Sequence, residues 1–407
     1  IVQPYAPPEV RFPVLHVDLY RIEDPAETGE LGLDDARYDS LLIVEWPERL
    51  PAAAWADALW LTLTIEPDGA RGLTAQVPAS WKDRWFLNPP ARALYFLEEL
   101  GWGDGEILPL AGDASFRRLF RVQAPGRTAI LMDAPPPQED ARPFIQVARW
   151  LTGRGFAAPQ IYGEDLNTGL VLIEDFGDAR LRETVDAAPE SELRLYEAAI
   201  DVLIRLREHE AADVGAYDRD VYQREAALLT DWYCPAVGLD VDVPGYVAAW
   251  DAVLAPVLGG APVTVLRDYH AENLMLIEGS ETFGLLDFQD ALAGHPAYDL
   301  VSLLQDARRD VHHDLEAAML DRYRRITSAD DAFFDAYHVL GAQRNAKIIG
   351  IFTRLWKRDG KPRYPSLCPR VWGYLERDLR HPALAPVAAW FDANIPAHLR
   401  GDPMVVA

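Results

Sequence analysis

The chain has 407 residues, of which 49% are hydrophobic and 25% charged, and this composition is typical of a soluble globular protein with more than one domain. A formal net charge of −25 and the lack of any basic run argue against direct nucleic-acid binding. No window of about 18 consecutive apolar residues occurs, so a membrane span is not expected.

Two further features limit the class of protein. Cys234 and Cys368 form no CxxC pair, which argues against a disulfide framework and against a zinc site. The first residues, IVQPYAPPEVRF, lack a basic segment followed by an apolar stretch, so neither a secretory signal nor a transit peptide is visible. We therefore expect a cytoplasmic location and no contact with a membrane.

The N-terminal part carries a pattern of short buried strands. Apolar runs at residues 13–20, 41–46 and 59–66 are separated by charged or turn-rich stretches, which is typical of an α/β domain. Pro89-Pro90 then opens a helical pattern that Gly101 closes. The sequence therefore predicts a first domain over residues 1–86 and a boundary near residue 87.

The pattern from residue 87 to 177 predicts a small β-rich lobe. A Gly-containing loop precedes two apolar segments that flank a turn at Pro125-Gly126, which indicates a hairpin. A helix (Glu139 to Arg154), a strand near Gln160 and the run GLVLIEDFG follow. From residue 178 to 407 the apolar residues recur with helical period, so we expect a larger helical lobe.

Three polar residues stand out in a β-like interruption of the helical lobe. Asp268 and Asn273 lie five residues apart on a loop between two apolar runs, and Asp287 follows a third. A hairpin would bring the Asp287 carboxylate back beside Asn273. Phosphoryl transfer needs a carboxylate near the acceptor hydroxyl and oxygen ligands for magnesium, and these three residues supply both.

The segments LRDYHAEN and LLDFQD resemble the core of the protein-kinase-like aminoglycoside and choline phosphotransferases over residues 108 to about 400. The resemblance implies an α+β, bilobal protein-kinase-like fold and ATP-dependent transfer. It makes Asp268 the catalytic base or acceptor-orienting carboxylate, and Asn273 and Asp287 the ligands of Mg²⁺. His270 and Asp290 are weaker neighbours.

Four segments narrow the resemblance further: GDASFRRLFRV, AILMDAPP, LIEDFGD and LRDYHAENLML. Together they resemble the cell-wall amino-sugar kinases that phosphorylate the anomeric hydroxyl of N-acetylmuramate and N-acetylglucosamine. This implies a small amino-sugar acceptor. It also implies a phosphate-covering loop with Gly112 and Ser115, and an interlobe hinge near Glu174 whose backbone pairs with adenine.

The sequence departs from the family pattern at two positions. Leu266 replaces the first His of the motif, and Met132 stands where related kinases carry a strand lysine that binds the α and β phosphates; no lysine occurs between residues 83 and 346. Because the triphosphate charge must still be balanced, we expect an arginine to help magnesium. The candidates are Arg117, Arg118 and Arg121, with Arg118 ranked first.

An acceptor pocket is expected in the helical lobe. The candidates that could line it are polar residues of the helical lobe: His270, Asp306, Arg344 and Asn345. Residues of these types are more often capping or surface residues. Asp299, at the head of an apolar helix, is predicted to organise the loop that carries Asp287.

Residues 1–86 show a second resemblance. The segments HVDLYRIEDPAETGELGLDD and IVEWPERLP resemble the second half of the bacterial ATPase that serves the tRNA threonylcarbamoyladenosine synthesis complex. The matching residues are His16, Asp18, Tyr20, Arg21, Glu45, Trp46 and Glu48. The G-x-x-x-x-G-K-[ST] loop of that family is missing, so we expect a truncated P-loop-NTPase-like fragment that does not hydrolyse ATP alone. Contacts with tRNA-modification proteins would run through this fragment but are not expected in the truncated form; an accessory α/β layer is the favoured role.

Two alternative functions stay open. An aminoglycoside or choline-type kinase would use the same core, and the acidic surface would suit a cationic acceptor. A pseudokinase or binding module attached to the tRNA-modification machinery would account for the missing strand lysine. The intact set of Asp268, Asn273 and Asp287 argues against the second alternative.

Overall fold

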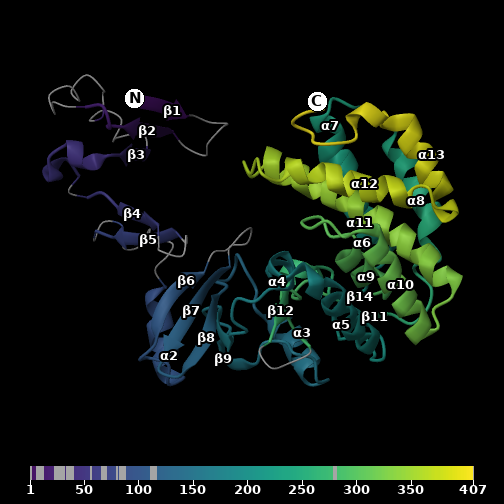
Figure 1. Cartoon of the computed structure of the whole chain (residues 1–407), viewed down its shortest axis with the longest axis horizontal. Coiled ribbons are helices and arrows are strands. Elements are labelled where there is room, and N and C mark those ends of the chain that lie inside the picture. Colours follow the sequence, from purple (N-terminus) through teal and green to yellow (C-terminus); the bar gives the residue numbers. More distant parts are fainter. Residues whose placement is uncertain are drawn as a thin grey trace. The chain divides into compact units, whose positions relative to one another are not determined.

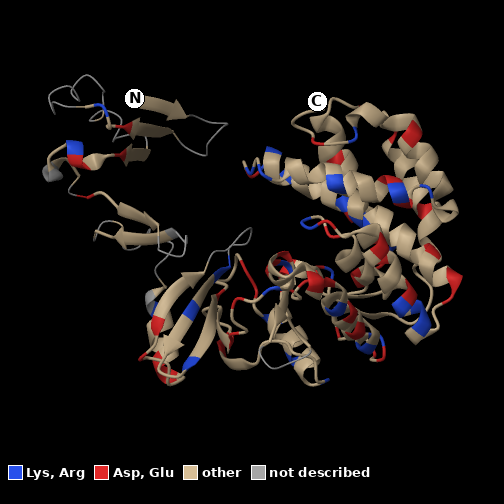
Figure 2. Cartoon of the chain, viewed as in Figure 1, with Lys and Arg blue, Asp and Glu red and all other residues tan. Residues whose placement is uncertain are grey.

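A computed structural model describes residues 2–5, 13–22, 33, 41–55, 57–65, 71–78, 81, 89–110, 117–277 and 282–406. By its internal contacts the chain divides into two units, Ile1–Pro89 and Pro90–Ala407 (Figure 1). Acidic and basic residues are interspersed along the elements of both units (Figure 2). None of the helices in these described ranges is long and apolar enough to cross a membrane.

The first unit contains the strands that the apolar runs predict. Its described strands form a three-stranded sheet and a separate hairpin: β1 (Val2–Tyr5), β2 (Val14–Asp18), β3 (Leu41–Glu45), β4 (Trp60–Ile65) and β5 (Arg71–Gln76). The short 3₁₀ helices η2 (Pro47–Arg49) and η3 (Ala52–Trp55) follow β3. β2 pairs parallel with β3 and antiparallel with β1. Val17, Leu19, Leu33 and Trp55 form a small core.

The second unit begins with α2 (Ala91–Glu99) and an antiparallel five-stranded sheet of order β6-β7-β8-β10-β9. The bounds are β6 (Glu106–Leu110), β7 (Arg118–Ala124), β8 (Arg127–Asp133), β9 (Ile161–Asp165) and β10 (Leu170–Glu174). Gly126 has φ 75° in the β7–β8 turn, which confirms the predicted hairpin. The predicted helix is α3 (Arg142–Thr152), shorter at both ends than expected.

The two faces of this sheet pack against different parts of the unit. Phe120, Val122 and Leu131 point to the face that α2 covers and form a small core with it. Met132 and Val171 point to the opposite face and join the large core that contains α3 and the helical part. Because neighbouring strand residues point to opposite faces, position along β7 decides which part of the unit a side chain can reach.

The rest of the second unit is mainly helical. Its α-helices are α4 (Leu181–Ala187), α5 (Glu192–Leu206), α6 (Arg219–Ala226), α7 (Cys234–Ala236), α8 (Val243–Leu254), α9 (Ala297–Leu304), α10 (His313–Thr327), α11 (Asp331–Lys357), α12 (Cys368–Asp378) and α13 (Ala385–Asn394). Two short antiparallel strand pairs interrupt them: β11 (Val263–Val265) with β14 (Leu292–Gly294), and β12 (Leu274–Leu276) with β13 (Phe283–Leu285). The β-rich part followed by the helical part is the architecture expected from the sequence.

Helix α11 is the central element of the helical part. It has 27 residues and packs against α6, α9 and α12. Gly350 allows this packing on one side, because a Cβ at that position would collide with the backbone of Leu228. The position of α11 matters for the site, since its side chains reach the loop described below.

We predict that Gly350→Ala lowers the free energy of unfolding by about 1–3 kcal/mol, the usual cost of forcing extra atoms into a packed core. The matched control is Gly373→Ala on α12, where a Cβ would meet nothing within 4 Å. Alanine favours helix, so the control should be neutral or stabilising by up to about 1 kcal/mol. Chemical denaturation followed by circular dichroism would measure both variants, and equal effects would contradict the packing argument.

Candidate functional site

The loop from Arg267 to Asn273 connects β11 to β12, and Asp287 follows β13 after one residue. β12 and β13 pair antiparallel, with Leu274 opposite Leu285, so the predicted hairpin is present. The backbone N–H of Leu286 donates to the Asn273 carbonyl at 3.1 Å. This pairing is what brings Asp287 back to Asn273, because the two residues flank the open end of the ladder.

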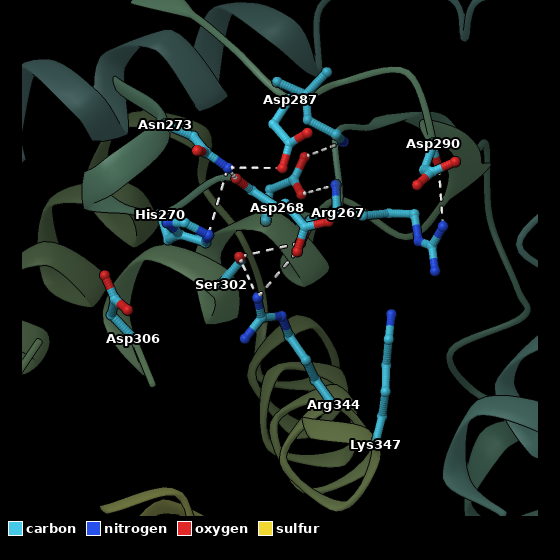
Figure 3. A network of polar contacts seen from close by, with 12 residues as sticks. Arg267, Asp268, His270, Asn273, Asp287, Asp290, Ser302, Asp306, Arg344 and Lys347 are labelled. Atoms are coloured by element: carbon cyan, nitrogen blue, oxygen red, sulfur yellow. Dashed lines mark hydrogen bonds and ion pairs between the residues drawn. The ribbon is translucent and has the colours of Figure 1, made fainter. Parts of the chain in front are cut away.

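Asp268, Asn273 and Asp287 lie together in the structure (Figure 3). The Asn273 side-chain amide donates to the Asp268 carbonyl at 2.9 Å and lies 3.4 Å from Oδ2 of Asp287. Gln289 donates to the other Asp287 oxygen at 2.8 Å. Asp287 has φ 59° and Arg267 φ 70°, left-handed conformations that non-glycine residues adopt at a cost and that gather at functional sites.

Helix α9 holds the backbone of the loop that carries Asp268. The buried Asp299 carboxylate accepts the backbone N–H groups of Leu266 at 2.7 Å and Arg267 at 2.8 Å. Ser302, one turn later, donates to the Arg267 carbonyl at 3.1 Å. Burial raises the pKa of Asp299 to about 7, against the opposing effect of the two N–H donors.

The contacts of Asp299 correct one expectation from the sequence. Asp299 was expected to organise the loop that carries Asp287, but its hydrogen bonds go to Leu266 and Arg267. The physical reason is its position on the first turn of α9, where its carboxylate meets the start of the Asp268 loop. Asp299 therefore fixes the Asp268 side of the site.

Two cationic side chains of α11 act on the Asp268 carboxylate, whose side chain is 45% exposed. Nη2 of Arg344 lies 3.9 Å from Oδ1 of Asp268. Loss of water around the carboxylate raises its pKa, but the charges of Lys347 and Arg344, followed by those of His270 and Arg267, outweigh this and hold the pKa of Asp268 below its ordinary value. Asp268 is therefore ionised at neutral pH.

A buried polar cluster lies behind the loop and was not predicted. Glu225 on α6 accepts hydrogen bonds from Arg267, from Tyr217 and, at 3.0 Å, from Lys347. Nζ of Lys347 also lies 3.2 Å from the Tyr298 hydroxyl. Burial raises the pKa of Glu225, but the positive charges of Lys347 and Arg267 lower it by more. The net pKa lies below the ordinary value, so Glu225 is charged at neutral pH. No local motif marks Glu225 or Lys347, because both sit on helices that lie far from the loop in the sequence.

Three other candidates are buried. His270 is 4% exposed, burial lowers its pKa, and its Nε2 lies 3.1 Å from Nη1 of Arg308. Asp306 accepts the backbone N–H groups of Arg308 at 2.8 Å and Ala271 at 3.3 Å. Asn345 donates to Gln305 at 2.7 Å. These contacts favour a role for Asp306 and Asn345 in supporting the loop, whereas their predicted contact with an acceptor stays a prediction.

The structure describes some, but not all, of the residues predicted to bind the nucleotide. Gly112 and Ser115 lie outside the described residues. Glu174 ends β10, and its Oε2 accepts the backbone N–H of Gln160 at 3.1 Å. Arg121 pairs with Asp175 at 2.7 Å and Asp178 at 2.9 Å, which ties the sheet to the segment after β10. The adenine contact near Glu174 stays a prediction.

The placement of Arg118 does not favour the phosphate contact predicted for it. Its side chain pairs with the fully buried Asp133, with Nε 2.9 Å from Oδ2, and Arg92 of α2 pairs with the same carboxylate. Arg118 therefore lies on the face that α2 covers, because it alternates with Leu119, which packs on the large core. Arg117 instead lies 3.7 Å from Glu139, in the segment that leads into α3.

Most of the chain is similar to known phosphotransferases. The family model described as "Phosphotransferase enzyme family" matches residues 106–338. The N-acetylmuramate/N-acetylglucosamine kinase of Caulobacter vibrioides is 38% identical over 351 residues, covering 75% of this chain and 96% of that protein. The kinase of the same name from Pseudomonas aeruginosa is 41% identical over 303 residues, covering 70% of this chain and 88% of that protein.

The N-terminal part is similar to a different family. The family model "Threonylcarbamoyl adenosine biosynthesis protein TsaE" matches residues 1–73. The tRNA threonylcarbamoyladenosine biosynthesis protein TsaE of Rickettsia bellii is 42% identical over 48 residues, which cover 12% of this chain and 32% of that protein. The chain therefore spans about a third of this relative.

Solved structures show the same fold at low identity. The choline kinase LicA from Streptococcus pneumoniae superposes with a TM-score of 0.52 at 12% identity, covering 73% of this chain and 99% of that one. The streptomycin–ATP–APH(2")-IIa ternary complex gives 0.51 at 15% identity, covering 73% and 98%. The fold is thus the bilobal protein-kinase-like one, and with the match over residues 106–338 the chain belongs to the phosphotransferase enzyme family.

Proposed function

We propose that this chain transfers the γ-phosphoryl group of ATP to the anomeric hydroxyl of N-acetylmuramate or N-acetylglucosamine. The names of relatives that are 38% and 41% identical over most of their length support this acceptor class. The observation that carries the proposal is the gathering of Asp268, Asn273 and Asp287 at one loop end, with Asp268 kept ionised by α11. The products would be the sugar 1-phosphate and ADP.

The residues fit a magnesium ion. Asn273 and Asp287 lie side by side, with Nδ2 of Asn273 3.4 Å from Oδ2 of Asp287. The amide oxygen of Asn273 and the Asp287 carboxylate would supply the oxygen ligands that Mg²⁺ prefers. The described ranges hold no group of three or more His, Cys, Asp or Glu that could bind a metal, which agrees with an ion that proteins hold through one or two side chains, phosphates and water. When bound, the ion would neutralise charge on the transferring phosphates.

Asp268 would orient the acceptor. As an ionised carboxylate it accepts a hydrogen bond from the anomeric hydroxyl and takes its proton as the oxygen bonds to phosphorus and the bond to ADP breaks. A lowered pKa makes Asp268 a weak base, so positioning should contribute more than proton abstraction. The hydrogen bonds from Asp299 to the preceding backbone restrict where the carboxylate can lie.

The phosphate charge would be balanced in part by Arg117. Met132 is 2% exposed and apolar, and Arg118 is held on the opposite face by Asp133. Arg117 and Glu139 have side chains that are 19% and 17% exposed, and they pair where the sheet meets the segment that leads into α3. In kinases a strand lysine binds the phosphates and is held in position by a glutamate on a helix. Arg117, paired with Glu139, would take the place of that lysine.

The two carboxylates should respond differently to substitution. Asp268→Asn should lower kcat with N-acetylmuramate by at least about 100-fold while ATP affinity stays within about twofold, because the carboxylate acts on the acceptor. Asp287→Ala should also raise the magnesium concentration for half-maximal rate by at least about tenfold, because a metal ligand is lost. Steady-state ADP release at varied Mg²⁺ measures both. Near-normal turnover in the first variant, or unchanged magnesium dependence in the second, would remove the assigned role.

Arg117 and Arg118 are adjacent, which makes them a matched pair for the nucleotide site. We expect Arg117→Met to raise the KM for ATP by about tenfold, the loss of one charge-assisted contact. Arg118→Met should leave that KM within about twofold and instead lower the melting temperature, because the buried Asp133 loses one of the two arginines that pair with it among the described residues. Initial rates at varied ATP and a thermal melt separate the two effects. If Arg118→Met raised the KM for ATP and Arg117→Met did not, the phosphate contact would be assigned to Arg118.

A further inference from the structure

Arg344 and Lys347 lie about one turn apart on α11, and both extend toward the loop that carries Asp268 (Figure 3). Arg344 reaches Ser302 at 2.7 Å and Asp268 at 3.9 Å. Lys347, about one turn later, lies 3.0 Å from Glu225, which also pairs with Arg267 at the start of the same loop. Both cations therefore stand on the acceptor side of the proposed reaction, since Asp268 is the residue that would meet the acceptor hydroxyl.

The Arg344 guanidinium has hydrogen-bonding capacity that the described residues do not fill. Its side chain is 5% exposed, and Nη2 donates to Ser302. Nη1 is buried and has no hydrogen-bond partner among the residues that the structure describes. A buried guanidinium nitrogen without an acceptor is unfavourable, and an oxygen of a bound ligand would relieve this.

Lys347 is only partly neutralised. Its Nζ lies 3.0 Å from Oε1 of Glu225, but Arg267 donates to the same oxygen. Two cations thus share one carboxylate. The chain as a whole is acidic, with a formal net charge of −25, and Lys347 is the only lysine between residues 83 and 356. A lysine at this position is therefore unusual for this chain.

An acidic acceptor would need this positive charge. Asp268 and Asp287 lie close to Asn273 in the site, and their carboxylates would repel an anionic group held beside them (Figure 3). N-acetylmuramate carries a carboxylate on its lactyl ether, and N-acetylglucosamine carries none. A neutral acceptor would gain little from Arg344 and Lys347, whereas an acid would gain a compensating contact with each.

We infer that Arg344 and Lys347 form a subsite for the carboxylate of an acidic sugar acceptor and give the chain a preference for sugar acids over neutral sugars. This inference rests on the proposed function, because it assigns the acceptor side to Asp268. Arg344 offers a planar guanidinium that can bind a carboxylate, and Lys347 adds a point charge about one helical turn away. The two residues are therefore specificity determinants, distinct from the residues that act on the phosphoryl group.

The test is equilibrium binding by isothermal titration calorimetry with magnesium and a non-hydrolysable ATP analogue, so that it does not depend on turnover. Wild-type protein should bind N-acetylmuramate at least about tenfold more tightly than N-acetylglucosamine and than the neutral methyl ester of N-acetylmuramate. Lys347→Met should reduce this preference to about threefold or less, and Lys347→Arg should retain most of it. Lys357→Met, on the exposed end of the same helix, is the matched control and should keep the wild-type preference.

The inference is overturned if the wild-type protein binds the acid and its methyl ester equally, a comparison that needs no variant to fold. It is also overturned if Lys347→Met weakens acid and neutral sugar alike. Parallel measurement of ADP release with both sugars reports on the proposed function itself. Preferential binding of the acid without turnover would contradict the kinase assignment and leave the subsite intact.

Discussion

The site depends on holding an ionised carboxylate in place where other negative charges must also gather. Asp268 has to stay charged and correctly oriented close to Asp287 and, in the proposed reaction, to a triphosphate. Like charges that gather at one site repel one another unless opposite charges compensate. The structure supplies the compensation from α11, through Arg344 and Lys347, and fixes the backbone through Asp299.

The arrangement explains why the helical part is built around α11. This helix packs against α6 and α9, which carry Glu225 and Asp299, so one packed group of helices presents both the cations and the groups that hold the loop. A loop alone could not maintain the left-handed backbone of Arg267 and Asp287. The geometry of the candidate site is therefore a consequence of helix packing as much as of the loop sequence.

The sequence predicts the local parts of this picture well. Strand pairing follows from apolar runs and a turn, so the hairpin that joins Asn273 to Asp287 could be expected. The face on which a strand residue points depends on register, and a shift of one residue moves a side chain across the sheet, so the pairing of Arg118 with Asp133 could not be predicted from the sequence. Glu225 and Lys347 could not be found, because their meeting with Arg267 is set by tertiary packing of helices that no local pattern relates.

The first unit has a separate character. Its described strands and small core of Val17, Leu19, Leu33 and Trp55 form within residues 1–89. Similarity to TsaE covers only about a third of that relative, and we propose an accessory role for this unit, because the candidate site residues lie in the second.

The central claim is that Asp268, Asn273 and Asp287 serve phosphorylation of an anomeric hydroxyl. The most direct measurement is phosphorus NMR of the product formed from ATP, magnesium and each of a panel of acceptors: N-acetylmuramate, N-acetylglucosamine, choline and an aminoglycoside. The account predicts a sugar 1-phosphate, seen as a phosphorus signal coupled to the anomeric proton, with choline and the aminoglycoside much poorer. A 6-phosphate, or faster turnover of choline or the aminoglycoside, would contradict it.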